Sequence, residues 1–147
     1  IGDNDIVTGK TSLLMGASAA AVLNALKKLA GIEEDALLIA PEVIEPVQEL
    51  KVKYMGNHNP RLHVDEALIA LSVSAATDPR AKLAIEQIPK LRGMQAHATV
   101  ILTSGDESMF KKFGVNLTCE PQYQTKKLYH SDLNICSIQR FFCSILG

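Results

Sequence analysis

Hydrophobic side chains recur at the 3.6-residue period of an α-helix early in the chain. Gly16 and Ser18 open this segment, which runs to about Lys28 and stops at Gly31, a residue type that often ends helices. Its apolar positions share one helical face: Ala19, Val22, Leu23, Leu26 and Leu29. The pattern therefore predicts an amphipathic helix that packs by this face.

Similar signals predict further helices later in the chain. One covers residues 65–76, and the next begins with Asp78 as its cap. A shorter helix follows in which Ser104 and Glu107 have capping-box spacing, and Gly114 ends it.

Short apolar runs that suit β-strands alternate with these helices. Ala36–Ala40 and Thr99–Thr103 have the apolar character of strands covered on both faces, which is typical of parallel sheets. Further strand candidates are Asp5–Thr8, Lys51–Met55 and Val115–Cys119. Strands that alternate with helices imply right-handed crossovers and parallel pairing. We therefore predict the α/β class: a Rossmann-like, three-layer domain in which helices flank a mostly parallel sheet.

The pattern changes after Tyr129. The segment 130–147 contains two of the three cysteines, and its apolar residues spread over more than one helical face. We therefore expect one α/β domain over residues 1–129 and, over residues 130–147, an appendage outside the core.

Composition narrows the functional classes. The chain has 147 residues, 47% of them hydrophobic, which suits one folded domain rather than a disordered chain. Fifteen Lys and Arg residues against sixteen Asp and Glu residues give a net charge of −1, which argues against a nucleic-acid partner. No signal-peptide pattern and no apolar run of about 20 residues is visible, so we expect a cytoplasmic protein without a membrane partner. The three cysteines form no CxxC pair, which argues against a disulfide framework and a metal site.

Residues 57–63 form the densest polar group of the chain. Arg61 offers a bidentate fork for an anion, and His63 can carry a proton near neutral pH. In a parallel sheet the loops after the strands form one rim, which would bring Lys10, Glu42 and the segment 104–106 to the same place. Arg61 and Lys10 would then anchor an anion, and His63 or Glu42 would transfer a proton.

A structural role for the same residues is the alternative. His63, Asp65 and Glu66 would cap the helix that follows, and Arg61 would pair with a carboxylate. His97 precedes the expected strand Thr99–Thr103 and so falls on the opposite rim, where a structural role is expected.

Gly9-Lys10-Thr11 has the ending of a phosphate-binding P-loop. The motif requires a glycine where this chain has Asn4, and the next helix begins too far downstream. A Gly-Lys turn after a strand is therefore favoured over a nucleotide hydrolase site.

Five motifs together resemble one bacterial family. They are IVTGK (6–10), APEV (40–43), NPRLH (59–63), AHAT (96–99) and LTCEPQY (117–123). The chain resembles, from Asp5 to Tyr129, the C-terminal domain of the domain-of-unknown-function family number eighteen-forty-six. The resemblance identifies the following as matching positions: Asn59, Arg61, His63, Glu66 and His97.

The resemblance also implies that family members are much longer and carry an N-terminal region. It implies a missing preceding strand, which would leave a sheet edge open to self-pairing. The resemblance implies no established activity. Some members carry a peptidase label, but no nucleophile and base have readable spacing here.

Two hypotheses about function remain. The first is a domain that contributes to a site for a phosphorylated small molecule or nucleotide at an interdomain cleft of the full-length protein. Its ligand-binding candidates are Lys10, Asn59, Arg61 and Glu66, its catalytic candidates are His63 and Glu42, and the sequence identifies no cofactor. The second is a docking or oligomerisation module, whose partner would be a second copy or the N-terminal domain.

Overall fold

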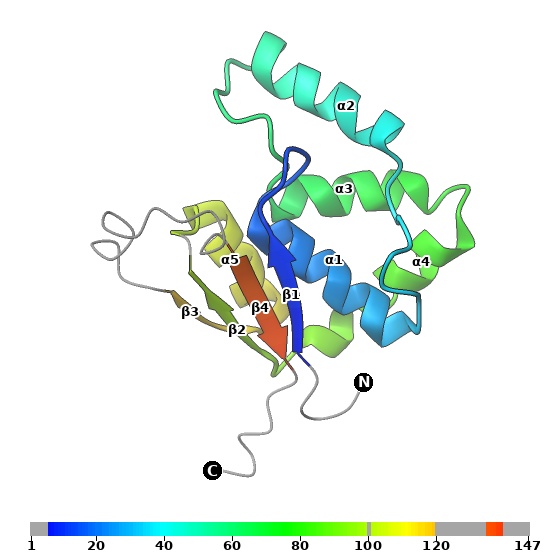
Figure 1. Cartoon of the computed structure of the whole chain (residues 1–147), viewed down its shortest axis with the longest axis vertical. Coiled ribbons are helices and arrows are strands. Elements are labelled where there is room, and N and C mark those ends of the chain that lie inside the picture. The colour runs from blue at the N-terminus through cyan, green and yellow to red at the C-terminus, as the bar shows by residue number, and fades with distance from the viewer. Residues whose placement is uncertain (1–5, 100, 120–134, 140–147) are drawn as a thin grey trace.

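A computed structural model describes residues 6–99, 101–119 and 135–139 (Figure 1). The α-helices are α1 (Ala17–Ala30), α2 (Pro41–Glu49), α3 (Val64–Ser74), α4 (Pro79–Ile85) and α5 (Ser104–Phe113). A π-helical turn, η1 (Leu50–Tyr54), follows α2, and a 3₁₀ turn, η2 (Ile88–Leu91), follows α4. The strands are β1 (Ile6–Lys10), β2 (Gln95–Ala98), β3 (Asn116–Cys119) and β4 (Ile135–Gln139).

The sheet is mixed, so the predicted Rossmann-like, mostly parallel sheet is wrong. Its strand order is β1-β4-β2-β3. β4 pairs antiparallel with β1 and with β2, and only β2 and β3 pair in parallel. The physical reason is that β4 is inserted, in the opposite direction, between two strands that precede it in the sequence.

The helices α1 and α5 pack on one face of this sheet. Residues that point toward them are buried, as Ala96 and Ala98 on β2 and Cys136 and Ile138 on β4 show. The alternate residues point to the other face and are exposed or half-buried, as His97 is on β2. In the described part of the chain no helix covers this second face, so the expected third layer is not present there (Figure 1).

Three expected strands have other structures. Ala36–Ala40 is irregular, and its Leu38 and Ile39 are buried in the core without sheet pairing. Lys51–Met55 falls in the helical turn η1 and its C-terminal end, where Lys51 is buried and the apolar side chains are exposed, the reverse of a strand's apolar face. Of the expected strand Thr99–Thr103, the described residues 99 and 101–103 follow β2 and form no strand. A short apolar run can bury its side chains as a strand, as a helical turn or as an irregular segment. Hydrophobic periodicity therefore does not distinguish these conformations in so short a run.

Local signals predicted the helices more accurately. Gly31 ends α1 in the left-handed conformation, with φ of 73°. Asp78 caps α4 by accepting a hydrogen bond from the Arg80 amide. The expected strand Val115–Cys119 is present as β3. Within the described residues no helix has the length and apolar character needed to cross a membrane.

The segment 130–147 contributes a strand to the core, contrary to expectation. Within β4, Cys136 is 0% exposed and Ile138 is 2% exposed, and both belong to the hydrophobic core. The appendage interpretation is therefore wrong for residues 135–139. The other residues of the segment lie outside the described part of the chain.

β1 packs directly on the backbone of α1 at Gly9. A Cβ atom at this position would lie 2.1 Å from the Ala21 amide nitrogen and 2.6 Å from the Ala17 carbonyl oxygen. Any side chain at residue 9 would therefore push the strand off the helix. The glycine of the Gly9-Lys10-Thr11 motif serves close packing.

We expect Gly9→Ala to destabilise the fold by about 3 kcal/mol or more, because backbone atoms must move to admit the methyl group. The free energy of unfolding in urea measures the effect. Gly105→Ala is the matched control, since its nearest neighbour would be the Thr103 hydroxyl at 3.8 Å. The control should change stability by less than about 1 kcal/mol. Equal effects of the two substitutions would contradict the packing role of Gly9.

Candidate anion-binding cleft

A cleft of about 260 Å³ lies where the N-termini of α1, α3 and α5 meet. Its lining residues come from these helix ends and from the loops beside them: Thr11, Gly16, Ala17, Ser18, Asn59, Arg61, His63, Ile101, Leu102, Thr103 and Asp106. Three helix N-termini concentrate backbone N–H groups and partial positive charge in one place. Such an arrangement favours an anionic ligand.

No side chain caps the N-terminus of α1. Gly16 occupies the cap position and offers no side chain, and the first turn holds no acidic residue. In contrast, the Thr103 hydroxyl of α5 accepts a hydrogen bond from the Asp106 amide at 3.1 Å. Ser18, in the first turn of α1, is 2% exposed and lines the cleft. The first turn of α1 can therefore donate to a ligand.

The loop that carries Arg61 is fastened to the turn before α1. The Leu62 amide donates to the Leu14 carbonyl at 3.0 Å, and the Gly16 amide donates to the Leu62 carbonyl at 3.1 Å. The Arg61 Nε donates to the Ser12 carbonyl at 2.5 Å. These bonds hold the guanidinium beside the first turn of α1.

A buried charge network supports the loop from behind. Lys51, whose side chain is 4% exposed, contacts Glu66 Oε1 at 2.7 Å and donates to the Arg61 carbonyl at 2.5 Å. The same Glu66 oxygen accepts from the His63 amide at 2.8 Å and closes a capping box at the start of α3. Because a buried ammonium needs partners, this network fixes where the loop ends and α3 begins.

His63 and Asp106 face each other in the cleft. The His63 Nδ1 lies 3.9 Å from Asp106 Oδ2, and Asp106 Oδ1 accepts a hydrogen bond from the Val64 amide at 3.0 Å. Burial raises the pKa of Asp106, while the Val64 amide and His63 oppose that rise. A carboxyl group in this position can orient the imidazole and stabilise its charged form.

The structure brings three of the predicted site residues together and separates the other three. Asn59, Arg61 and His63 line the cleft. Glu66 lies behind it in the Lys51 network. Lys10 ends β1 and Glu42 opens α2, and neither lines the cleft. The separation follows from the sheet, because the shared rim was inferred from a mostly parallel arrangement.

Thr103 and Ser18 also line the cleft and were not site candidates, and Asp106 was expected on the rim only as part of the segment 104–106. Thr103, and not Ser104, caps α5, so Asp106 is the residue whose amide meets the cap. The threonine before Ser104 was the available signal, because both residue types cap helices well. Ser18 was identified only as part of a helix start.

Two further motifs lie elsewhere. His97 lies in β2 on the uncovered face of the sheet, with its Nδ1 2.8 Å from the Thr118 hydroxyl oxygen. Gly9 and Lys10 lie within β1 and not in the expected turn, and α1 begins only at Ala17, so no helix starts at this motif. This geometry differs from a P-loop, in which the helix begins at the lysine.

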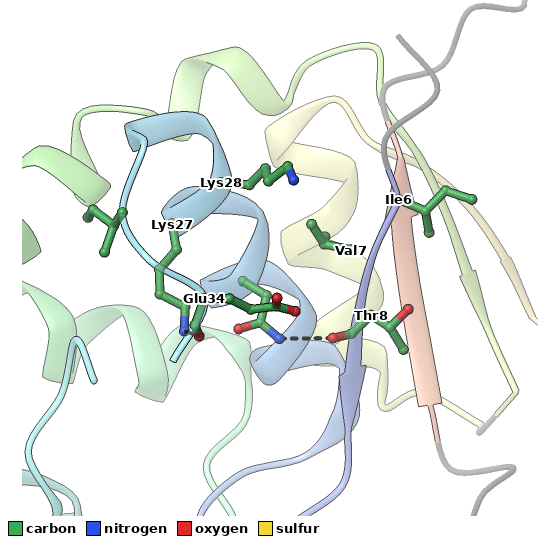
Figure 2. A pocket seen from close by; sticks show the side chains of 8 residues that line it. Ile6, Val7, Thr8, Lys27, Lys28 and Glu34 are labelled. Atoms are coloured by element: carbon green, nitrogen blue, oxygen red, sulfur yellow. Dashed lines mark hydrogen bonds between the residues drawn. The ribbon is translucent and has the colours of Figure 1, made fainter. Parts of the chain in front are cut away.

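A second hollow, of about 270 Å³, lies between β1 and α1 (Figure 2). The Asn24 amide donates to the Thr8 carbonyl at 2.8 Å and so covers an acceptor of this edge strand. The Lys27 ammonium donates to the Glu34 carbonyl at 2.6 Å, and burial lowers the pKa of Lys27, against the effect of Glu34. The hollow borders the C-terminal half of α1, where the helix dipole disfavours anions.

Comparison with known proteins confirms the resemblance. Residues 1–129 match the family described as "Domain of unknown function DUF1846, C-terminal". UPF0371 protein CE2832 of Corynebacterium efficiens is 57% identical over 127 residues, which are 86% of this chain and 26% of that protein. UPF0371 proteins of Corynebacterium diphtheriae and Streptococcus pyogenes serotype M5 are 54% and 50% identical over 127 residues, with the same coverage. The chain thus spans about a quarter of the length of these relatives.

We expect the pH dependence of stability to change in Asp106→Asn. The folded state holds the Asp106 proton more strongly than the unfolded state, because burial raises its pKa. Its contribution to stability is therefore full below the ordinary carboxyl pKa of about 4 and is lost as pH rises through the raised value. Urea unfolding at a series of pH values should show that the free energy of unfolding of the variant rises relative to that of the wild type as pH rises. Asp65→Asn, at an exposed position, controls for lost charge, and a difference independent of pH would contradict the assignment.

Proposed function

Since the chain belongs to the family of the domain of unknown function DUF1846, as its C-terminal domain, and spans a quarter of its relatives, we propose that it supplies one wall of a ligand site in a longer protein. The ligand is a phosphorylated small molecule or a nucleotide, and its phosphoryl group binds in the cleft. The domain itself is uncharacterised, and the names of its relatives state no activity.

One observation carries this proposal: the uncapped N-terminus of α1 lies in the same cleft as the anchored Arg61 side chain. A phosphoryl oxygen can accept from the first-turn amides of α1 while the guanidinium neutralises its charge. Because Nε is held by the Ser12 carbonyl, little side-chain entropy is lost when the ligand binds.

The size of the cleft supports a site shared with another part of the protein. A volume of about 260 Å³ is slightly below the range of about 300–1,000 Å³ typical of small-molecule pockets. It suits a phosphoryl group with part of its substituent. The rest of the ligand would contact the portion of the longer protein outside this chain.

His63 is the proposed proton-handling residue of the site. It lines the cleft, and Asp106 lies 3.9 Å from its Nδ1. Asn59 lines the cleft beside Arg61 and uses its Oδ1 to accept from the Arg61 amide at 3.0 Å. The proposal gives Lys10, Glu42 and Glu66 no contact with the ligand inside this domain.

We further propose a cytoplasmic setting, in which thiols stay reduced. Cys119 and Cys136 are both free thiols.

A docking module is the second proposed function. The uncovered face of the sheet favours it, since a sheet face that no described helix covers is open to packing by another element. The partner would be the remainder of the longer protein or a second copy of the chain. Sedimentation velocity distinguishes the two functions: a dimer that forms with rising concentration and ignores phosphate compounds supports docking.

We expect a phosphorylated ligand to raise the melting temperature of the chain and Arg61→Ala to abolish that rise. Inorganic phosphate, Mg-ATP and glucose 6-phosphate are suitable probes. A ligand at 100 times its dissociation constant adds about 2.7 kcal/mol, which shifts the melting temperature by several degrees. The compared quantity is the ligand-dependent shift, because loss of the bond to Ser12 by itself lowers stability by about 1 kcal/mol.

Arg80→Ala is the matched control for this measurement. Arg80 pairs with Asp78 on α4 and does not line the cleft, so its removal should leave the ligand-dependent shift intact. Equal shifts in the wild type and Arg61→Ala would contradict the phosphoryl site. The absence of any shift in the wild type would favour the docking function.

A further inference from the structure

The space between β1 and β2 is filled by a single strand, β4. β4 pairs with β1 along five positions, from Ile6 with Gln139 to Lys10 with Ile135. On its other side it pairs with all four residues of β2. β1 and β2 therefore lie two strand spacings apart, roughly 9.5 Å, and are joined through β4 alone (Figure 1).

The space between β1 and β2, called the slot below, must be filled by a strand for the domain to fold. Cys136 and Ile138 point from β4 into the core, and both are almost completely buried. Removing the strand would leave a cavity over α1 and would unpair the backbone groups of two strands at once. Unpaired buried backbone groups and a cavity left by two buried core side chains both lower the stability of a fold strongly.

The strand that fills the slot lies outside the segment shared with the family. The family match covers residues 1–129, and β4 begins at Ile135. The matched segment contains β1, α1 and β2, so relatives that are 50–57% identical over it have the same two strands to join. About three quarters of each relative's chain lies outside the match and is available to supply the joining strand.

We propose that the space between β1 and β2 is a strand-acceptor site, filled in this chain by β4 and in longer family members by an extended segment from outside the matched domain. The incoming segment runs antiparallel to both neighbours. Its side chain opposite Gly9 and Ala98, at the place of Cys136, is small, and the one at the place of Ile138 is a larger apolar residue. The residue between them faces the uncovered side and can be polar, as Ser137 is.

The test vacates the slot within the full chain. Ser137→Pro introduces a residue without an N–H in the middle of a central strand, where proline is essentially never found. We expect this variant to lose its cooperative thermal transition. Ser137→Thr, which suits a strand and keeps a hydroxyl on the uncovered face, is the matched control and should melt like the wild type.

Refolding the Ser137→Pro chain from urea with peptides then asks what the slot accepts. One probe is a peptide of residues 133–142, and the others are overlapping 15-residue peptides that cover the unmatched part of the Corynebacterium efficiens relative. We expect the first peptide and at least one of the others to restore a cooperative transition. A scrambled peptide of the same composition should not.

A milder variant keeps the test valid if the proline chain aggregates. Ile138→Ala retains all backbone pairing but weakens the hold of β4, so a competing peptide should raise its melting temperature. Three results would overturn the proposal: a proline variant as stable as Ser137→Thr, no response of either variant to the 133–142 peptide, or a response to that peptide and to none from the relative.

Discussion

The close approach of β1 to α1 at Gly9 is the contact on which the rest of the structure depends. Because a Cβ atom at Gly9 would lie only 2.1 Å from a backbone nitrogen of α1, β1 can pack on this helix at one distance only. That packing distance determines where the chain leaves β1 and turns toward Gly16. The same turn presents the Ser12 carbonyl to Arg61 and leaves the first turn of α1 open. The packing of one glycine therefore determines the geometry of the cleft.

A buried network of polar groups around Lys51 also determines the shape of the cleft, because it holds the loop that carries Arg61. Lys51 is buried beneath the loop that ends in His63, and its ammonium holds both the Arg61 carbonyl and the Glu66 carboxylate. A buried charge with such specific partners tolerates few alternative loop conformations. Glu66 thus stabilises the loop that forms one wall of the cleft, while Arg61 and His63 line the cleft itself.

The sequence predicted those features that depend on neighbouring residues. Helix ends at Gly31 and Asp78 follow from local capping chemistry, and the polar loop around Arg61 is visible as a local cluster. The sheet depends on pairing between distant segments, and no local signal showed that Ile135–Gln139 enters between two earlier strands. Lys10 and Glu42 were assigned to the cleft through the assumed parallel sheet, so that error passed directly into the site. The expected rim included Asp106 within the segment 104–106, but no local pattern indicated that its carboxylate would lie opposite His63.

The two thiols that flank Ala98 give the sheet a built-in chemical probe. Cys119 on β3 is exposed, whereas Cys136 on β4 is buried, and burial raises the pKa of Cys136 to about 12. Alkylating reagents attack thiolates, so Cys136 is protected while β4 stays in place. Its modification rate, read by mass spectrometry against that of Cys119, therefore reports how often the central strand departs. The native cysteines thus allow opening of the sheet to be measured without introducing a further cysteine.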